Sequence, residues 1–363
     1  MEEWQTFRRP NHISINPSSR RRYAQRTGKT ALMRTYLGVD GGGSKTLFLL
    51  IDETGKVLAS HAEGTAYYPE IGLEALKKLL ARGIGQILRQ ATLSRSDLSF
   101  AFLGLPAYGE DSALLATLDT APASVLPTGR YRCGNDMVCG WAGALAGADG
   151  ISIVAGTGSI AYGEYAGRGA RAGGWGELFS DEGSAYWMAR EGLRLFSRMS
   201  DGRVPRGLLY ELVRRHFVLE YDLDLCAAIY GKRLAQRSQF AQLSRLVVEA
   251  AKAGDAAAHA LFVEAAAELA EIVDAVRSQL RVPAEARLPV SCSGGMFEPH
   301  ELLRAPLKDA LAAPPRNYGF VGARLPSEAG AAVHAAKLSG TPIPAAGIAA
   351  LEAHFGTGQD RSP

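Results

Sequence analysis

The sequence predicts an α/β protein built from two similar halves, and three observations support this prediction. Residues 36–51, YLGVDGGGSKTLFLLI, place a glycine loop between two apolar, β-rich runs. Residues 150–167, GISIVAGTGSIAYGEYAG, repeat this arrangement, and residues 39–44 match residues 154–159 at four of six positions. In each half, β-runs are followed by segments with helical periodicity. We therefore expect an internal duplication of one α/β unit.

The first half is expected to start as a β-meander. Runs at 35–40 and 46–52 flank the glycines, and the turn ETGK leads into a third run at 57–60. The elements expected next are a helix at 73–91, a strand at 98–106, a helix at 110–119, a strand ending in YRCGND and a small-residue helix at 140–147. Asp149 lies in a glycine-flanked segment that suits a domain junction.

The second half repeats the strand, loop and strand before a mainly helical region. Ala185, Ala189, Leu193 and Phe196 share one helical face, and helical periodicity extends to residue 280. A short strand with a glycine turn, LPVSCSGGMF, and a helix of small residues, SEAGAAVHAAKLSG, follow. The expected domains are a disordered basic extension at 1–33, an N-terminal domain at 34–147, a C-terminal domain with a helical insertion at 148–335, and a C-terminal helix and tail at 336–363 that packs back on the N-terminal domain.

Composition and charge exclude several classes of protein. The 363 residues are 47% hydrophobic, which is enough for two cores. Residues 1–33 carry seven Lys or Arg against Glu2 and Glu3, a net +5, which leaves −2 of the total +3 for the rest. This segment lacks aromatic interleaving and apolar periodicity, so a disordered extension is favoured over a nucleic-acid-binding arm. We expect no nucleic-acid partner.

No segment indicates a membrane, a metal cluster or a disulfide framework. Apolar runs stay below the roughly 18 residues of a membrane helix, and no charged-then-apolar signal segment opens the chain. The cysteines Cys133, Cys139, Cys226 and Cys292 form no CxxC pair, so we expect reduced, mostly buried thiols. A cytoplasmic protein without a membrane partner is expected.

Three glycine loops, each directly after a β-run, indicate phosphate binding. Glycine accepts positive φ and leaves successive backbone N–H groups accessible to an anion. Any single loop would equally suit a tight hairpin turn, but the duplication favours nucleotide binding. Two other phosphate signatures fail: RTGKT has Tyr23 where a P-loop needs its first glycine, and the G-x-G-x-x-A match at 156–161, with Glu177 downstream, is followed by a strand instead of a helix.

Five segments in this order and spacing resemble a known family: GVDGGGSKT, GND, VAGTGS, GGWGELFSDEGSAYW and SCSGGMF. They resemble the BadF/BadG/BcrA/BcrD-type ATPases, and within them the N-acetylglucosamine and glucosamine kinases, over residues 36 to about 337. The resemblance implies duplicated actin-like ATPase domains, related to ribonuclease H, with ATP and acceptor in an interdomain cleft.

The resemblance also implies a role for each matched residue. The ATP-binding residues would be Gly41, Gly42, Gly43, Ser44, Lys45 and Thr46 in the first phosphate loop, Gly156, Thr157 and Gly158 in the second, and Ser293, Gly294 and Gly295 against adenosine. Asp40 would face Mg²⁺ through water, and Asp136 would be the catalytic base. The sugar-binding residues would be Thr65, Tyr108, Asn135, Asp136, Gly174, Trp175 and Asp181.

The implied activity is transfer of the γ-phosphoryl group of ATP to the 6-hydroxyl of an amino sugar. N-acetylglucosamine, glucosamine and N-acetylmuramic acid are the acceptors considered, and we expect a homodimer that requires ATP and Mg²⁺. Two alternatives remain: a non-catalytic sugar or nucleotide sensor, and an ATPase activator of a dehydratase, which would need Cys133 and Cys139 as iron–sulfur ligands.

Some residues with a proposed functional role also have a purely structural interpretation. Asp136, between a strand and a small-residue helix, would also suit an N-cap, and Asp181 with Glu182 would suit the start of a helix. Trp175 lies between glycines, which is unusual for a core residue and favours a ring that faces sugar. The departures from the family pattern, at Ala66, Tyr67, Tyr108, Ile160 and Ser180, fall on acceptor contacts and spare the phosphate loops. The sequence therefore specifies ATP more firmly than the acceptor.

Overall fold

The structure, a computed structural model, describes residues 33–231, 237–298 and 301–356. The basic segment 1–33 therefore lies, apart from Met33, outside the described residues. The chain forms two compact units, the first ending at Gly147 and resuming at Leu325, and the second running from Ala148 to Arg324. The chain thus returns to the first unit about ten residues before the expected boundary at 335, because the helix after Leu325 packs on the first sheet.

The first unit is built on a five-stranded mixed sheet. Its strands are β1 (Thr35–Gly41), β2 (Thr46–Asp52), β3 (Val57–Glu63), β4 (Leu98–Leu105) and β5 (Tyr131–Asn135), in the order β3-β2-β1-β4-β5. β1, β2 and β3 pair antiparallel as the expected meander, whereas β4 and β5 join in parallel beside β1. The carboxyl ends of β1, β4 and β5 therefore meet at one edge of the sheet, where polar side chains gather.

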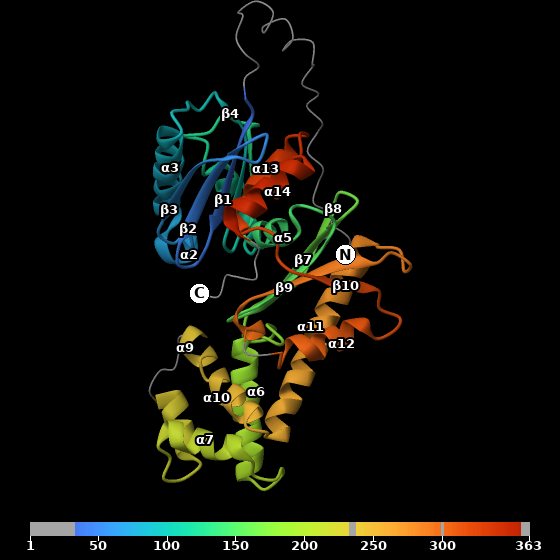
Figure 1. Cartoon of the computed structure of the whole chain (residues 1–363). Coiled ribbons are helices and arrows are strands. Elements are labelled where there is room, and N and C mark those ends of the chain that lie inside the picture. The colour runs from blue at the N-terminus through green and yellow to red at the C-terminus, as the bar shows by residue number, and fades with distance from the viewer. Residues whose placement is uncertain (1–32, 232–236, 299–300, 357–363) are drawn as a thin grey trace, which may run out of the picture. The chain divides into compact units, whose positions relative to one another are not determined.

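Helices cover both faces of this first sheet (Figure 1). Leu37 and Val39 share a core cluster with α3 (Leu73–Gln90), whose Gly83 lies against the Phe48 ring. Because side chains alternate along a strand, Gly38 faces the other way, towards α13 (Ser327–Leu338). The remaining helices of the unit are α2 (Tyr68–Ile71), α4 (Leu115–Thr120), α5 (Met137–Leu145) and α14 (Ala345–Phe355).

Small residues let α13 approach β1 and α5 at backbone distance. A Cβ at Gly38 would come within 2.3 Å of the Ala332 backbone nitrogen, and one at Gly330 within 2.0 Å of the Gly143 nitrogen. A larger side chain at either position would push the helix away from the sheet. The small-residue composition of SEAGAAVHAAKLSG is thus explained by close packing, and it brings Ser327 to the end of β1.

The second unit repeats the sheet of the first. Its strands are β6 (Gly150–Ala155), β7 (Ser159–Tyr165), β8 (Arg168–Gly173), β9 (Leu288–Ser293) and β10 (Tyr318–Val321), in the order β10-β9-β6-β7-β8. β6, β7 and β8 form the antiparallel meander, and β9 and β10 add in parallel beside β6. This order reproduces that of the first sheet strand for strand, so the predicted duplication is confirmed.

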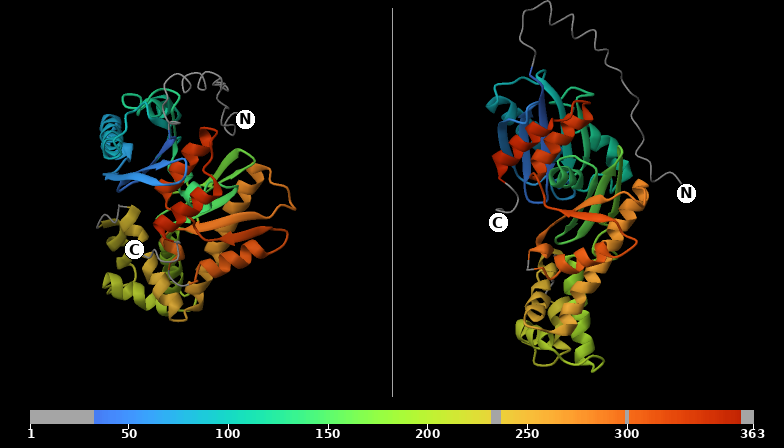
Figure 2. Two further views of the ribbon diagram at one scale, coloured as in Figure 1. Left: turned by 45° about the horizontal axis from the view of Figure 1, so that its top comes forward. Right: turned by 45° about the vertical axis from the view of Figure 1, so that its right-hand side comes forward.

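Helices inserted between β8 and β9 contribute most of the buried side chains of the second unit's core. Figure 2 shows these helices in yellow-green to orange. They are α6 (Ala185–Ser200), α7 (Leu208–Phe217), α8 (Asp224–Cys226), a π-helical turn (Ala227–Gly231), α9 (Arg237–Ala241), α10 (Ser244–Lys252) and α11 (Ala256–Leu280). α12 (Arg304–Ala312) precedes β10. The strands β8 and β10 and the helix α12 are not expected from the sequence, whereas α14 is the helix expected within residues 336–363. The residues of β8, RGARAG, have low β-propensity, and pairing with β7 makes them a strand.

The helices and the cysteines bear on two further expectations from the sequence. No helix within the described ranges is both long and apolar enough to span a bilayer. Cys133 and Cys139 are buried and Cys292 is partly buried, whereas Cys226 is exposed. All four are free thiols and most are at least partly buried, as expected; the exposed Cys226 lies at the end of α8.

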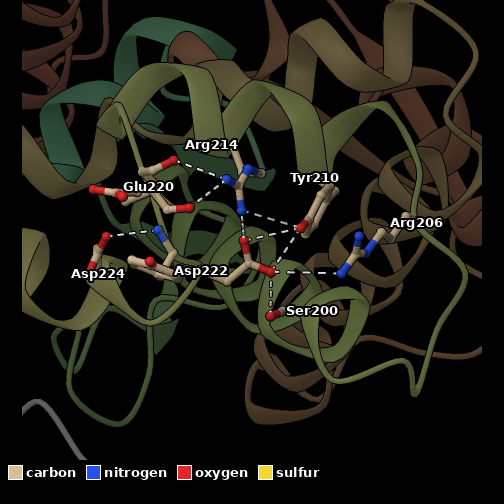
Figure 3. A network of polar contacts seen from close by, with 9 residues as sticks. Ser200, Arg206, Tyr210, Arg214, Glu220, Asp222 and Asp224 are labelled. Carbon is tan, nitrogen blue, oxygen red and sulfur yellow. Dashed lines mark hydrogen bonds and ion pairs between the residues drawn. The ribbon is translucent and has the colours of Figure 1, made fainter.

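A network of hydrogen bonds and ion pairs centred on Asp222 joins the loop after α7 to α6 and α7 (Figure 3). The Asp222 carboxylate accepts hydrogen bonds from Ser200 Oγ at 2.7 Å and Tyr210 OH at 2.8 Å, and it pairs with Arg214. Arg214 also donates to the Glu220 carbonyl at 3.0 Å. Partial burial acts to raise the pKa of Asp222, but the bonds from Ser200, Tyr210 and Arg214 outweigh it and hold that pKa below its usual value.

Asp222→Asn is expected to lower the free energy of unfolding by about 1–2 kcal/mol, because charge-assisted hydrogen bonds are the stronger ones. A depressed carboxyl pKa stabilises the fold above the unfolded-state pKa, and this stabilisation is lost as pH falls through the folded-state pKa. The difference between wild type and variant should therefore shrink in acid, as measured by urea unfolding from pH 7 down to pH 3. Asp201→Asn, which breaks an exposed pair with Arg203, serves as the control. Equal losses in the two variants would contradict a special role for Asp222.

Candidate functional site

The first glycine loop forms the hairpin turn between β1 and β2. The Gly42 N–H donates to the Lys45 carbonyl at 2.9 Å, and the Ala66 N–H donates to the Gly42 carbonyl at 3.1 Å. A Cβ at Gly43 would meet no atom within 4 Å, so the backbone at the tip is open to a ligand. The loop is thus a tight hairpin turn, which was the alternative to phosphate binding, and its backbone groups are also accessible to a ligand.

The expected use of positive φ is wrong for most of the loop glycines. Gly41, Gly42, Gly43, Gly156 and Gly158 all have φ outside the left-handed region. Gly294, at φ 104°, is an exception. At the other positions the useful property is the missing Cβ, because a side chain at Gly41 would come within 2.7 Å of the Gly104 carbonyl.

Two carboxylates lie at the carboxyl edge of the first sheet, Asp40 near the end of β1 and Asp136 directly after β5, with β4 between the two strands. Asp40 lies near the end of β1, where it accepts a hydrogen bond from Ser327 Oγ at the start of α13. Burial raises the pKa of Asp40, although Ser327, Cys139 and Lys45 act to lower it. Burial, together with repulsion from Asp40, raises the pKa of Asp136 to about 7. The two groups therefore interact electrostatically and share one desolvated region.

The N-cap alternative for Asp136 is not supported by its contacts. Asp136 occupies the residue before α5, but its side chain makes no capping hydrogen bond. The Met137 N–H donates instead to Asn135 Oδ1 at 3.1 Å, and Asn135 Nδ2 donates to the Tyr108 carbonyl at 3.1 Å. Asn135 thus accepts from the first N–H of α5, and no capping hydrogen bond commits the Asp136 carboxylate, although the backbone N–H groups of Asp136 and Met137 act to lower its pKa.

The donor set around Asp40 fits Mg²⁺ that arrives with a nucleotide. Within the described part of the chain, no three His, Cys, Asp or Glu side chains are grouped so that they could hold a metal. Mg²⁺ is usually bound through one or two carboxylates, phosphate oxygens and retained waters, so a full protein cage is not needed. Asp40 and Asp136 both carry raised pKa values, and a cation beside them would relieve that desolvation.

Cys139 belongs to this region as a packing residue. It is fully buried, and its Sγ donates to the Val39 carbonyl at 3.5 Å. Burial, with Asp40 and Asp136 nearby, raises its pKa well above the usual value. A buried, protonated thiol is a poor cluster ligand, because the thiolate is the metal-binding form.

The other predicted sugar-binding residues of the first unit lie around the first loop or near Asn135. Thr65 Oγ1 donates to the Gly42 carbonyl at 3.3 Å and accepts from the Tyr67 N–H at 3.0 Å. The Tyr108 hydroxyl donates to Asp119 at 2.7 Å, and burial together with Asp119 raises its pKa above the ordinary value. The structure therefore brings Thr65 to the phosphate loop, whereas it joins Tyr108 to Asn135 through the Tyr108 carbonyl.

The second unit brings the other two glycine loops together. The Gly156 N–H donates to the Gly158 carbonyl at 2.9 Å in the turn between β6 and β7. β9 pairs with β6, so the turn after Ser293 lies beside this loop. A Cβ at Gly294 would come within 2.5 Å of the Ala155 carbonyl, and glycine is needed there for both space and φ. The backbone of one loop therefore lies directly against that of the other.

The segment between β8 and α6 is a series of left-handed turns. Gly173, Gly174, Gly176 and Gly183 have positive φ, as does Asp181 at 62°. Asp181 and Glu182 therefore do not open the helix, because α6 starts at Ala185 and Ser184 Oγ caps it by accepting from the Trp187 N–H at 3.2 Å. The helix-start alternative for the acidic pair is wrong.

Trp175 and Asp181 differ sharply in exposure. Trp175 is 71% exposed, with the Arg171 guanidinium 5.8 Å from its ring centroid, so it is not a core residue. Asp181 is 1% exposed, accepts from the Ser159 N–H at 3.3 Å, and pairs with Arg237. Burial raises the pKa of Asp181, although Arg237 acts to lower it. Asp181 thus lies against the glycine loop between β6 and β7.

The predicted site residues therefore form two sets, one in each unit. The first unit holds Asp40, Gly41, Gly42, Gly43, Ser44, Lys45, Thr46, Thr65, Tyr108, Asn135 and Asp136, and the second holds Gly156, Thr157, Gly158, Gly174, Trp175, Asp181, Ser293, Gly294 and Gly295. Sequence reasoning missed Ser327 and Arg237. Neither residue lies in a motif, and each reaches its carboxylate through tertiary packing.

Known proteins resemble this chain in sequence and in fold. The sequence pattern of the BadF/BadG/BcrA/BcrD ATPase family matches residues 37–333. An N-acetyl-D-glucosamine kinase of Dictyostelium discoideum is 28% identical over 272 residues, covering 72% of this chain and 85% of that protein. An N-acetylmuramic acid/N-acetylglucosamine kinase of Clostridium acetobutylicum is 28% identical over 268 residues, covering 73% and 86%. The crystal structure of a candidate N-acetylglucosamine kinase of Chromobacterium violaceum superimposes with a TM-score of 0.59 at 26% identity, covering 83% of this chain and 98% of the other.

Proposed function

This chain belongs to the BadF/BadG/BcrA/BcrD ATPase family, and we propose that it is an ATP-dependent amino-sugar kinase. The reaction is transfer of the γ-phosphoryl group to the 6-hydroxyl of N-acetylglucosamine or of a close relative, glucosamine or N-acetylmuramic acid. The named relatives, which are N-acetylglucosamine and N-acetylmuramic acid kinases, support the substrate class. The observation that carries the proposal is the half-buried Asp136, which directly follows β5, makes no capping hydrogen bond and, with a pKa of about 7, suits a general base.

Asp136 would act on the acceptor. Its carboxylate takes the proton from the sugar hydroxyl as that oxygen bonds to the γ-phosphorus and the bond from the γ-phosphorus to the ADP oxygen breaks. A base with a pKa near the working pH is ionised in about half of the molecules and still holds the proton it receives. Asn135 fixes the start of α5 through Met137, so the backbone that carries Asp136 is held in place.

The glycine loops would bind ATP. Backbone N–H groups of residues 41–46 and 156–158 would hold the phosphates, and residues 293–295 would contact adenosine, where the lack of side chains permits close approach. Asp40 would hold a nucleotide-bound Mg²⁺ through water. The ion would supply charge neutralisation at the phosphates, which is the main electrostatic demand of phosphoryl transfer.

The proposed acceptor contacts come from residues of both units. Thr65, Tyr108 and Asn135 in the first unit, with Gly174, Trp175 and Asp181 in the second, would line the sugar. The hydroxyl of Tyr108 and the amide of Asn135 already have protein partners, so sugar contacts from them would use their remaining atoms.

An acceptor panel tests this function directly. We expect ADP release that depends on both Mg²⁺ and an amino sugar, with N-acetylglucosamine, glucosamine and N-acetylmuramic acid compared in a coupled assay. The 6-deoxy analogue of the best acceptor should bind without turnover, and phosphorus–proton NMR correlation should place the product phosphate on C6.

Other outcomes separate the alternatives. ATP hydrolysis that ignores every sugar would contradict the kinase proposal, and iron bound by anaerobically purified protein would favour the dehydratase activator. Sugar binding by calorimetry without any turnover would favour a sensor.

A further inference from the structure

Arg237 at the start of α9 bridges two carboxylates of the turn-rich segment before α6. Its Nε lies 3.2 Å from Glu177 Oε2, and its guanidinium also pairs with Asp181. The Arg237 side chain is 42% exposed, whereas that of Asp181 is 2% exposed. The charge pair therefore has one end in the protein interior, where removal of the cation leaves an uncompensated carboxylate.

The second phosphate loop is shaped around this ion pair. Gly158 does not have positive φ, so backbone conformation does not require glycine there. A Cβ on Gly158 would lie 2.2 Å from Arg237 Nη2 and 2.8 Å from Asp181 Oδ2. The missing side chain at Gly158 thus makes room for the two charged groups directly over the loop.

The charges around Asp181 come from a small set of groups. Burial acts to raise the pKa of Asp181, Arg237 and the Ser159 N–H act to lower it, and Glu177 acts to raise it. Arg237 is thus the cation that favours the ionised carboxylate, and it also neutralises Glu177. An ionised carboxylate is a hydrogen-bond acceptor at both oxygens, whereas a protonated one places a donor on one of them.

We propose that Arg237 is a positioning residue of the kinase reaction, which holds the buried Asp181 carboxylate against Gly158 and so fixes its place in the acceptor site. This inference rests on the proposed function, in which Asp181 binds the sugar. The helical insertion thereby contributes to the acceptor site through α9. A second contact, between the rings of Tyr186 and Phe240 at 4.7 Å, attaches α9 to α6 without charge.

Steady-state kinetics of four variants test the inference. Arg237→Gln is expected to raise the KM for the amino sugar about 10-fold or more, because the buried carboxylate loses its partner. The KM for ATP should change less than about 2-fold. Arg237→Lys keeps the charge and should recover part of the loss, although an ammonium cannot bridge both carboxylates in the same way. Asp181→Asn should resemble Arg237→Gln, and the double variant should be no worse than Asp181→Asn alone.

The pH dependence of kcat/KM for the sugar distinguishes a role of Arg237 in positioning Asp181 from a role that only keeps α9 docked on α6. Without Arg237, burial and Glu177 act on Asp181 unopposed by a cation, so its pKa rises. The acid limb of kcat/KM for the sugar should therefore move to higher pH in Arg237→Gln and stay near its wild-type position in Arg237→Lys. Phe240→Leu, which weakens α9 docking without changing a charge, should leave that limb in place. Arg215→Gln, which removes an exposed ion pair with Glu249, serves as the matched arginine control.

The possible results distinguish failure of the positioning role from failure of the proposed function. An unchanged sugar KM and acid limb in Arg237→Gln, with active wild type, would overturn the positioning role alone. A rise confined to the KM for ATP would overturn it in favour of a phosphate contact. Equal acid-limb shifts in Phe240→Leu and Arg237→Gln would show that α9 docking is the cause. Wild-type protein that turns over no sugar would instead remove the proposed function, and the positioning role with it.

Discussion

Asp136→Asn is expected to lower kcat by a factor on the order of 10² to 10⁴, because the amide cannot take the proton of the acceptor hydroxyl. ATP affinity should hardly change, since the proposed role of Asp136 concerns the acceptor. The measurements are kcat, nucleotide binding by calorimetry and the melting temperature of the same variant. Near wild-type turnover would remove Asp136 from the chemistry and leave Asp181 as the next carboxylate to test.

The stability of Asp136→Asn gives an independent result. A carboxyl group whose folded pKa is raised destabilises the fold as pH rises from its unfolded value towards its folded value of about 7. The variant lacks this penalty, so in EDTA its melting temperature should equal that of the wild type near pH 4 and exceed it near pH 8. A residue that stabilised the fold as an N-cap would show no such trend.

Asp111→Asn is the matched control for this variant. Asp111 lies in the same unit and caps a short helical turn by accepting from the Ala113 N–H at 2.9 Å. Because Asn caps about as well as Asp, this substitution should be nearly silent in activity and stability. A comparable loss of kcat in Asp111→Asn would mean that the assay reports general damage to the unit.

Asp40→Asn is expected to lower activity about 10- to 100-fold at limiting Mg²⁺ and to raise the Mg²⁺ concentration for half-maximal rate. Groups that contact a metal through its bound waters typically contribute effects of this size. The amide can still accept the hydrogen bond from Ser327, so the end of β1 should keep its structure. Titration of the rate with Mg²⁺ at fixed ATP measures the effect.

Two comparisons make the Asp40 result specific. High Mg²⁺ should restore much of the activity of Asp40→Asn and none of that lost in Asp136→Asn. Ser327→Ala keeps the Asp40 carboxylate and should shift the Mg²⁺ dependence less. A Mg²⁺ dependence identical to that of the wild type would contradict a metal role for Asp40 while leaving the Asp136 prediction intact.

Elements with strong local signals could be predicted from the sequence, and elements stabilised by their neighbours could not. The apolar, β-branched runs that became β1, β2 and β6 predict strands by themselves. The strand β8 consists of Arg, Gly and Ala, and its hydrogen bonds to β7 stabilise it. The helix α13 was expected, but its place against Gly38 follows from close packing that no local pattern encodes.

The sequence by itself determined the duplicated strand–loop–strand units, the backbone loops suited to phosphate, and an aspartate after a strand at position 136. These features are local, because glycine content and alternating apolar residues act over a few positions. Tertiary structure alone decided the electrostatic state of the carboxylates. Ser327 reaches Asp40 across 287 positions and Arg237 reaches Asp181 across 56. Burial and a neighbouring carboxylate set the pKa of Asp136, and both depend on which distant segments exclude water around it.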